Sequence, residues 1–240
     1  IDGSALTAPP ELSQLTYTNE YNLDVYSTQG NVMKVCKEGV EFQFASKRIE
    51  SLKTRVTMYG AWIKTIYNSD SPQYKASSIL LDNKQLKYVG LYNGDNGTES
   101  QAFNTNFMFD TYIQRLGLTF STSAQCTWYT NRRNLWNNGV PVSYIDQSGE
   151  THPFREEDKN NIQQLQHLVE KYSATYFERT TVPFYMDINL KASKRIGKYL
   201  NLAFYVNRLL GIYPDYTLRG VLQRRTSESP YFGMEMNLTF

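Results

Sequence analysis

Residues 184–192 read Phe-Tyr-Met-Asp-Ile-Asn-Leu-Lys-Ala, and the alternation of apolar and polar side chains in this stretch decides the fold. Successive side chains of a β-strand point to opposite faces, so a strand with this pattern has one apolar and one polar face. The apolar set is Phe184, Met186, Ile188, Leu190 and Ala192, and the polar set is Tyr185, Asp187, Asn189 and Lys191. The pattern predicts an amphipathic strand directly after Pro183.

The same alternation recurs in six other stretches of the chain. These are residues 40–44, 52–62, 103–113, 116–128, 200–206 and 232–240. The alternation continues over lengths that let a tilted strand of about 9–11 residues cross a bilayer. The sequence therefore predicts about seven long antiparallel strands and an all-β fold.

The connections between these strands alternate in length. Three are short and polar (46–51, 114–115 and 194–198), and the three between them are long (68–101, 131–181 and 209–230). Outer-membrane barrels have tight turns on the periplasmic side and long loops outside, whereas a Greek-key sandwich has no reason to sort its connections in this way. We therefore expect a segment of a transmembrane β-barrel, with Phe240 ending in the periplasm.

The polar face of the strands is rich in Asn, Thr, Ser, Tyr and Gln and carries only scattered charges. A soluble sheet usually carries more Lys and Glu, so this face is typical of a hydrated lumen, and the apolar face would contact lipid. Aromatic residues cluster near the expected outer strand ends, where a membrane interface favours them. They are Trp62, Trp128, Tyr67, Tyr129 and Phe184, and ordinary core packing is the alternative explanation.

Composition argues against several other classes of protein. The chain has 240 residues with a net charge of +2 and no long basic run, which makes nucleic-acid binding a poor hypothesis. No run of about 18 apolar residues exists, so transmembrane helices are not expected. Cys36 and Cys126 form no disulfide framework, and His152 and His167 are too far apart for a recognisable zinc site. No catalytic or nucleotide-binding motif is present, so we expect neither an enzyme nor a cofactor.

The polar face and the loops contain the candidate residues for a ligand path. They are Tyr185, Asp187, Tyr205, Tyr213, Tyr216 and Trp136, and the loops add Tyr176 and Phe177. Aromatic rings in such loops can stack on flat ligands or sugar rings, although loop packing explains them equally well. Asp187 and Glu235 could form a carboxylate pair, but ordinary lumen polarity is the favoured explanation.

The long loops also contain local patterns. Residues 155–172 have the apolar spacing of an amphipathic helix, which would pack on its neighbours or form a lid or a lipoprotein-binding surface. Residues 142–145 and 151–154, around Gly149, predict a small hairpin. Residues 93–97 are rich in turn formers, and they lack the full spacing of an EF-hand calcium loop.

Three parts of the chain carry its most distinctive motifs. Residues 230–240 read Pro-Tyr-Phe-Gly-Met-Glu-Met-Asn-Leu-Thr-Phe and end on an aromatic residue, as outer-membrane barrels typically do. Residues 187–207 contain a Lys-Arg-Ile-Gly-Lys turn followed by Leu-Asn-Leu-Ala-Phe-Tyr-Val-Asn, and residues 37–42 precede a strand at 54–65 that contains Gly-Ala-Trp. Together these stretches resemble the last strands of Bacteroidetes-type TonB-dependent outer-membrane receptors.

The resemblance implies that residues 1–240 are the C-terminal part of a barrel of about 22 strands, whose plug domain and N-terminal strands lie outside this sequence. It implies a Gram-negative outer-membrane receptor that imports a nutrient ligand of the glycan, peptide, siderophore or cobalamin class into the periplasm. The implied partners are outer-membrane lipids, the transported ligand and the TonB complex, which would contact a segment before the plug. Membership of the SusC-like subgroup, with its surface lipoprotein lid, is left open.

Two other hypotheses are left open by the sequence. A small self-contained outer-membrane barrel with an adhesion or structural role would need an eighth strand, because single-chain bacterial barrels have an even number. Residues 21–26 are the candidate for that strand. A secreted β-sandwich that binds carbohydrate would instead cover the face of Phe232, Met234 and Leu238 with a second sheet.

Overall fold

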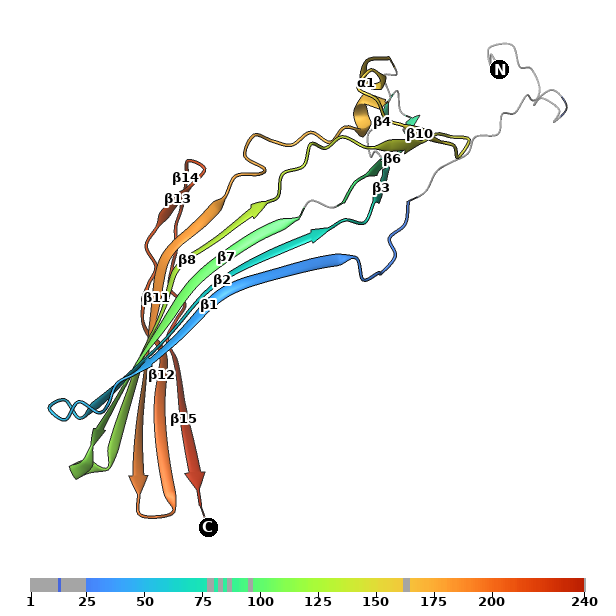
Figure 1. Cartoon of the computed structure of the whole chain (residues 1–240). Coiled ribbons are helices and arrows are strands. Elements are labelled where there is room, and N and C mark those ends of the chain that lie inside the picture. Colours follow the sequence, from blue (N-terminus) through green and yellow to red (C-terminus); the bar gives the residue numbers. More distant parts are fainter. Residues whose placement is uncertain are drawn as a thin grey trace, which may run out of the picture. The chain divides into compact units, whose positions relative to one another are not determined.

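The computed structural model describes residues 25–76, 88–94, 97–161 and 165–239, together with Ser13 and the backbone of residues 80–81 and 84–85. The chain forms two compact units (Figure 1). The large-sheet unit comprises Met33–Ser69, Asn96–Asn137 and Ser173–Phe240. The small-sheet unit comprises Ile1–Val32, Asp70–Asp95 and Asn138–Tyr172.

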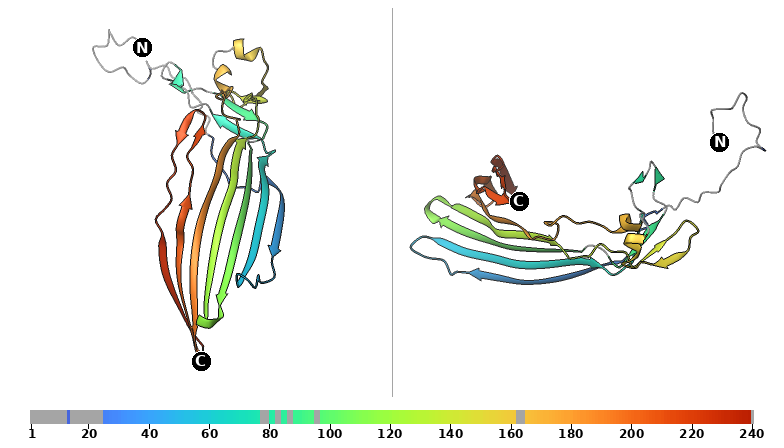
Figure 2. Two further views of the ribbon diagram at one scale, coloured as in Figure 1. Left: turned by 90° about the vertical axis from the view of Figure 1, so that its left-hand side faces the viewer. Right: turned by 90° about the horizontal axis from the view of Figure 1, so that it is seen from above.

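Seven antiparallel strands form the large sheet. They are β1 (Met33–Ala45), β2 (Thr54–Ser69), β7 (Thr98–Ile113), β8 (Leu118–Asn134), β11 (Thr180–Ile196), β12 (Leu200–Ile212) and β15 (Tyr231–Leu238). They pair in this order, so each strand of the sheet lies beside the next one along the chain. All seven strands expected from the alternation are present, and the prediction of an antiparallel all-β fold is confirmed. Over the described residues the sheet is open, with β1 and β15 at its edges, and it is visibly curved (Figure 2).

Several strands reach further into the connections than the sequence predicts. Tyr67 pairs with Thr98, and Arg132 pairs with Thr180, so the long connections are shorter than expected. At the other end of the sheet Ile196 pairs with Leu200, which confines the turn to residues 197–199. The alternation of apolar and polar residues stops at these ends, but the backbone hydrogen bonds of the sheet do not depend on it.

The strand pairing places the apolar sets of neighbouring strands on one face of the sheet. Phe42 pairs with Gly60, which pairs with Thr105, and this row continues to Cys126 and Met186. Gly60 is required in this row because a Cβ atom there would overlap the Phe42 ring, which lies flat across the glycine. Both cysteines are free thiols; Cys126 is buried and Cys36 is exposed.

The apolar face of the large sheet is largely uncovered. Phe204, Phe232, Met234 and Leu238 are 51, 59, 73 and 53 % exposed, respectively. No second layer of described residues packs on them, contrary to what a β-sandwich requires. Among the described residues, no helix has both the length and the apolar character needed to cross a membrane.

The small-sheet unit has its own sheet and core. Its strands are β3 (Gln73–Ala76), β6 (Val89–Tyr92), β9 (Ser143–Ile145) and β10 (Thr151–Pro153), in the order β10-β9-β6-β3, and β4 (Leu80–Leu81) pairs with β5 (Lys84–Gln85). Tyr144, Leu165 and Leu168 form the core, with Tyr88 and Phe154 packed against it. The hairpin predicted around Gly149 is confirmed as β9 and β10, and Gly149 has the positive φ of 85° that its turn requires.

The amphipathic helix expected over residues 155–172 is not formed as one helix. The described part contains a short helix α1 (Asp158–Asn161) and a 3-10 turn η4 (Leu165–Leu168). Leu165 and Leu168 are buried as expected, but a spacing of three residues fits a 3-10 turn as well as an α-helix. The N–H of Glu170 donates to the carbonyl oxygen of Gly139 at 2.9 Å, so the chain leaves the helical path after η4.

Two other sequence features lie partly outside the described residues. Of the candidate eighth strand, residues 21–24 lie outside them, and Val25 and Tyr26 are not in a strand. Of the loop at 93–97, residues 95–96 lie outside them.

Replacing Gly139 by alanine should lower the free energy of unfolding of the small-sheet unit by about 1–2 kcal/mol. Gly139 has a φ of 71°, and an added Cβ would overlap the carbonyl oxygen of Glu170. Hydrogen exchange at the Glu170 amide should rise in the variant. Gly149→Ala is the matched control, because Gly149 also has a positive φ but has open space around it. Equal effects of the two changes would show that backbone strain alone matters.

Candidate functional site

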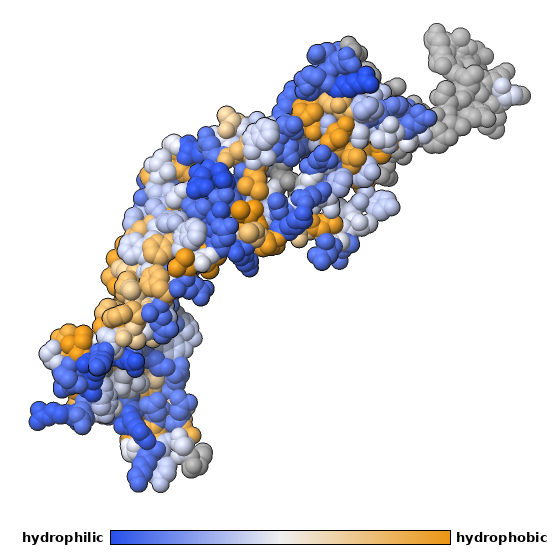
Figure 3. All heavy atoms as spheres, viewed as in Figure 1, coloured by the Kyte–Doolittle hydropathy of each residue, from blue (hydrophilic) through white to orange (hydrophobic). Residues whose placement is uncertain are grey.

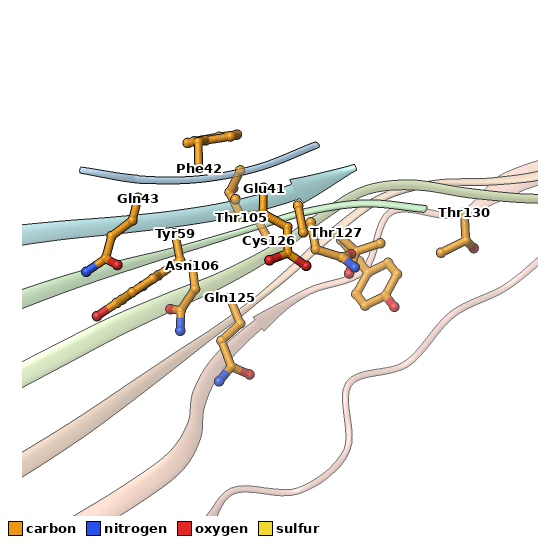
Figure 4. Close-up of a pocket in the computed structure, with 14 residues that line it drawn as sticks. Glu41, Phe42, Gln43, Tyr59, Thr105, Asn106, Gln125, Cys126, Thr127 and Thr130 are labelled. Carbon is orange, nitrogen blue, oxygen red and sulfur yellow. The ribbon is translucent and has the colours of Figure 1, made fainter. Parts of the chain in front are cut away.

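A hollow of about 670 Å³ lies on the polar face of the large sheet. Its polar lining includes Glu41, Gln43, Tyr59, Asn104, Asn106, Gln125, Thr127 and Tyr185. Gln43, Tyr59, Asn106 and Gln125 form one paired row across β1, β2, β7 and β8. Figure 4 shows their side chains extending to the same side of the strands, whereas Phe42 points the opposite way.

The chemistry of this hollow suits a polar ligand. Each Asn or Gln side chain offers both a hydrogen-bond donor and an acceptor, and Tyr59 adds a phenol. Among the described residues, Oδ1 of Asn106 is buried and has no hydrogen-bond partner. A buried acceptor without a partner costs about 1–3 kcal/mol, so a side-chain rotation that exposed this amide to a donor of a bound molecule would be favoured.

Beside the hollow, three tyrosines surround one arginine. Tyr213 follows β12, and Tyr216 begins the hairpin of β13 (Tyr216–Leu218) and β14 (Val221–Gln223). The guanidinium carbon of Arg225 lies 4.6, 5.4 and 5.7 Å from the ring centroids of Tyr185, Tyr213 and Tyr216. The rings of Tyr185 and Tyr213 stack at 5.6 Å. We call these four residues the arginine cage.

Asp187 fastens the arginine cage to β11. The hydroxyl of Tyr213 lies 2.7 Å from each carboxylate oxygen of Asp187 and donates to this group. Burial, together with this hydrogen bond to an anion, raises the pKa of Tyr213 to about 12. Tyr213 therefore remains a neutral donor at any physiological pH. The backbone N–H of Arg225 donates to Asp215 at 2.9 Å, which holds the arginine end of the loop.

The structure brings together four of the six candidate ligand-path residues, namely Tyr185, Asp187, Tyr213 and Tyr216. Tyr205 lies elsewhere, with its ring 6.1 Å from Tyr231 and across Gly233. Trp136 is 76 % exposed in the connection after β8.

Asp187 and Glu235 are not a carboxylate pair. Glu235 forms an ion pair with Lys191 at 2.8 Å. Glu235 pairs with Ala203 of β12, which in turn pairs with Ser193 of β11. Ser193 lies about 20 Å from Asp187 along β11.

Arg225 and the part of the hollow formed by β1 and β2 were not predicted from the sequence. Gln43 and Tyr59 belong to the polar alternation, and that signal could have identified them. Arg225 lies in an irregular loop, where no periodic pattern predicts which strand a side chain will reach.

Aromatic residues form a belt on the apolar face. The Phe103 ring lies 6.2 Å from Trp128, whose ring lies 5.3 Å from Phe184. Trp62 donates from Nε1 to the hydroxyl of Tyr129 at 3.0 Å. Phe103 of β7 pairs with Tyr129 of β8, and the next residue, Asn104, pairs with Thr127. Trp128 therefore has no partner on β7 and is an extra residue of β8. This β-bulge lets adjacent Trp128 and Tyr129 share one face.

The expected aromatic cluster is therefore confirmed for four of its five members. Tyr67 is five positions from Trp62 on the regularly paired strand β2, so it faces the opposite side of the sheet. Immediately beyond the belt, on the same face, Glu99 is nearly buried between Arg133 at 2.8 Å and Arg179 at 2.7 Å.

A group of potential metal ligands lies at the β9–β10 hairpin. Asp146, Glu150 and His152 each have a ligand atom within 4.8 Å of the others. The expectation of no recognisable zinc site rested on the separation of the two histidines and did not include this group. The carboxylate of Asp146 already accepts hydrogen bonds from Ser148, and one oxygen lies 2.8 Å from Nε2 of His152.

The β9–β10 turn should loosen in acid. Hydrogen bonds from Ser148, from His152 and from the Glu150 amide hold the pKa of Asp146 far below its usual value. A carboxyl with a lowered folded-state pKa stabilises the turn above its ordinary pKa, and this contribution is lost as the pH falls towards the folded-state value. The protection factors of the Ser148 and Glu150 amides against hydrogen exchange should therefore fall below about pH 4. Asp146→Asn should have low protection factors at these amides already at pH 7, with no further fall in acid; a fall in that variant would assign the effect to another group.

Comparison of the chain with protein-family models, with curated proteins and with solved structures found no match.

Proposed function

We propose that the large sheet is part of the wall of an outer-membrane β-barrel that imports a nutrient ligand, as the resemblance to TonB-dependent receptors implies. The observation that carries this proposal is the pairing of an uncovered apolar face with a polar, hollowed face on the same long strands. In water an exposed apolar face of this size is unfavourable, whereas in a bilayer it is the face that contacts lipid.

The topology supports this proposal. The sheet is a simple antiparallel meander, and its connections alternate between 3–8 residues and much longer segments, as in barrels with short turns on one side of the membrane. The aromatic belt lies towards the long-connection end, and the ionic group of Glu99 follows immediately. This order, from apolar band to aromatic belt to charge, matches the change from hydrocarbon to headgroups.

The open edges favour a large barrel over a small self-contained one. Both β1 and β15 have an unpaired side within the described residues, and seven is an odd number of strands. Exposed edges are costly because their backbone groups lack partners in the sheet. Further strands on both sides, up to about 22 in total, would satisfy these edges. A small barrel with an adhesion or structural role remains the alternative hypothesis.

In this proposal the polar face lines the lumen and the hollow contacts the ligand during passage. Energy would come from the TonB complex through a segment before the plug, and the surrounding lipids would be those of the outer membrane. The amide-rich lining suits a polar ligand, and the proposed classes are glycan, peptide, siderophore and cobalamin. A surface lipoprotein lid also belongs to the proposal only through the family resemblance.

The first test is whether the full-length protein is an integral outer-membrane barrel. We expect it to stay in outer membranes during alkaline carbonate extraction and to migrate faster in unheated than in boiled gel samples. Extraction by carbonate would contradict the proposal.

The second test is transport. Deleting the protein, or removing TonB, should abolish growth on the same nutrient from a panel of the four ligand classes. Asn106→Ala should impair growth on that nutrient, because it removes an amide from the polar row that lines the hollow. Phe42→Leu is a control on the opposite face. Growth that depends on the protein but not on TonB would be compatible with a transporting barrel. It would contradict the proposed coupling to the TonB complex.

A further inference from the structure

The short-turn end of the large sheet carries concentrated positive charge. This end contains the three short connections, at residues 46–53, 114–117 and 197–199, with the last residues of β11. Its basic residues are Lys47, Arg48, Lys53, Arg115, Lys194, Arg195 and Lys198, and its acidic residue is Glu50. The whole chain has 25 basic and 23 acidic residues, so this imbalance is local. We call these seven basic residues the basic rim.

Most charges of the basic rim have no acidic partner. Glu50 pairs with Lys53 at 2.8 Å and lies 4.0 Å from Arg48. Among the described residues, no salt bridge involves the other five side chains, and all five are exposed. Their mutual repulsion would be relieved by an anionic partner.

Backbone contacts place the three turns side by side. The N–H of Arg195 donates to the carbonyl oxygen of Gly117 at 3.3 Å, which joins the second and third turns. The N–H of Tyr112 donates to the carbonyl oxygen of Lys53 at 3.1 Å, and the Arg48 guanidinium donates to the carbonyl oxygen of Tyr112 at 3.3 Å. The rim is therefore one continuous surface, and Figure 3 shows hydrophilic residues gathered at this end next to a more hydrophobic band.

Exposed apolar side chains alternate with these charges. Leu52, Leu116, Ile196 and Tyr199 are 64, 59, 45 and 65 % exposed on the same turns. A hollow of about 640 Å³ at this end is lined by Arg195, Lys198 and Tyr199, among others. Cations mixed with exposed apolar groups match an anionic lipid interface, where phosphates meet the charges and acyl chains meet the apolar groups.

We propose that the basic rim binds the phosphate groups of anionic phospholipids in the leaflet on the short-turn side. The inference rests on the proposed function, because only a membrane-embedded sheet places this end at a lipid headgroup layer. The lipid would hold the wall at a fixed depth in the bilayer. Each cation near an anionic surface contributes about a fivefold gain in affinity at moderate salt, and this gain is screened as salt rises.

The test compares lipids that differ only in their headgroup. Full-length protein in neutral detergent is mixed with phosphatidylglycerol or phosphatidylcholine of identical acyl chains, and retained lipids are counted by native mass spectrometry. We expect phosphatidylglycerol to be retained at least tenfold more strongly. The variant Lys47→Gln, Arg115→Gln, Lys194→Gln and Lys198→Gln should lose this preference. The variant Lys47→Arg, Lys194→Arg and Lys198→Arg should keep it.

A matched control removes four cations from other parts of the chain. Lys37→Gln, Arg132→Gln, Lys171→Gln and Arg224→Gln should leave the preference intact. Equal retention of the two lipids by the wild-type protein, or equal loss in both Gln variants, would overturn the inference. So would binding of poly-L-glutamate without a lipid preference, which would assign the rim to an acidic polypeptide.

Membrane insertion separates this inference from the proposed function. If the protein resists carbonate extraction but shows no headgroup preference, the proposed function stands and the lipid site is contradicted. If carbonate extracts the protein, both are contradicted. If the Gln variant fails to fold, the wild-type preference at low and high salt still decides, because phosphate binding must weaken as salt rises.

Discussion

In the proposed barrel, replacing Ala124 by arginine should destabilise the large sheet by about 2–4 kcal/mol, the cost of a lipid-facing arginine near the bilayer centre. Ala124 lies in the middle of β8, paired with Phe107 on one side and with Ile188 on the other. All three belong to the apolar face. Alanine is small, so the substitution removes almost no packing and its effect reports mainly on the surroundings of that face.

The neighbouring residue provides the matched control. Gln125 is exposed on the polar face, level with Asn106 and Asp187. An arginine at position 125 would remain hydrated and would lie near a carboxylate, so we expect a change below about 1 kcal/mol. The measurement is denaturant unfolding of the full-length protein in lipid vesicles. Equal tolerance of the two arginines would show that the apolar face does not contact lipid.

Replacing Arg225 by alanine should release the β12–β15 connection from the polar face. Arg225 contacts three tyrosine rings and lies 3.4 Å from the carbonyl oxygen of Pro183. Partly desolvated cation–π contacts contribute up to about 2 kcal/mol each and are not additive, so we expect a loss of about 2–3 kcal/mol in loop docking. Cleavage of this connection by chymotrypsin should then accelerate roughly 30- to 160-fold, if cleavage follows the open population.

Arg224→Ala is the control for this change. Arg224 is exposed, and among the described residues no hydrogen bond or salt bridge involves its side chain. Chymotrypsin does not cleave after arginine, so neither variant removes a cleavage site. Arg225→Lys should give an intermediate rate, because an ammonium keeps the charge but lacks the planar group that stacks on rings. An unchanged rate in Arg225→Ala would show that Tyr213 and Asp187 hold the connection alone.

The arginine cage also joins the β12–β15 connection to the hollow on the polar face. Tyr185 lines the hollow and contacts Arg225, so release of the loop would change one wall of the hollow. A ligand that enters from the long-connection side would meet this connection first. The uptake test is therefore informative for both variants. Arg225→Ala would change the access of the ligand to the hollow, whereas Asn106→Ala would change the contact of the ligand with its lining.

The amino-acid sequence alone determined the strands and the two faces of the large sheet. Alternation such as that of residues 184–192 is local, and it specifies a face wherever the strand is regularly paired. The neighbour pairs β1–β2, β7–β8 and β11–β12 followed from the short turns, because a turn of a few residues forces its flanking strands to be antiparallel neighbours. The tertiary structure decided the pairs that long connections join. The Gly149 hairpin was predictable for the same reason.

Only the tertiary structure decided where local patterns were interrupted or where distant segments met. The bulge at Trp128 moved Tyr129 onto the aromatic belt, and no sequence signal marked the extra residue. The spacing of Leu165 and Leu168 fitted two kinds of helix, and packing on Tyr144 was compatible with the shorter one. Arg225 reached Tyr185 from 40 positions away, because irregular loops are positioned by the contacts they make and not by any periodicity of their own.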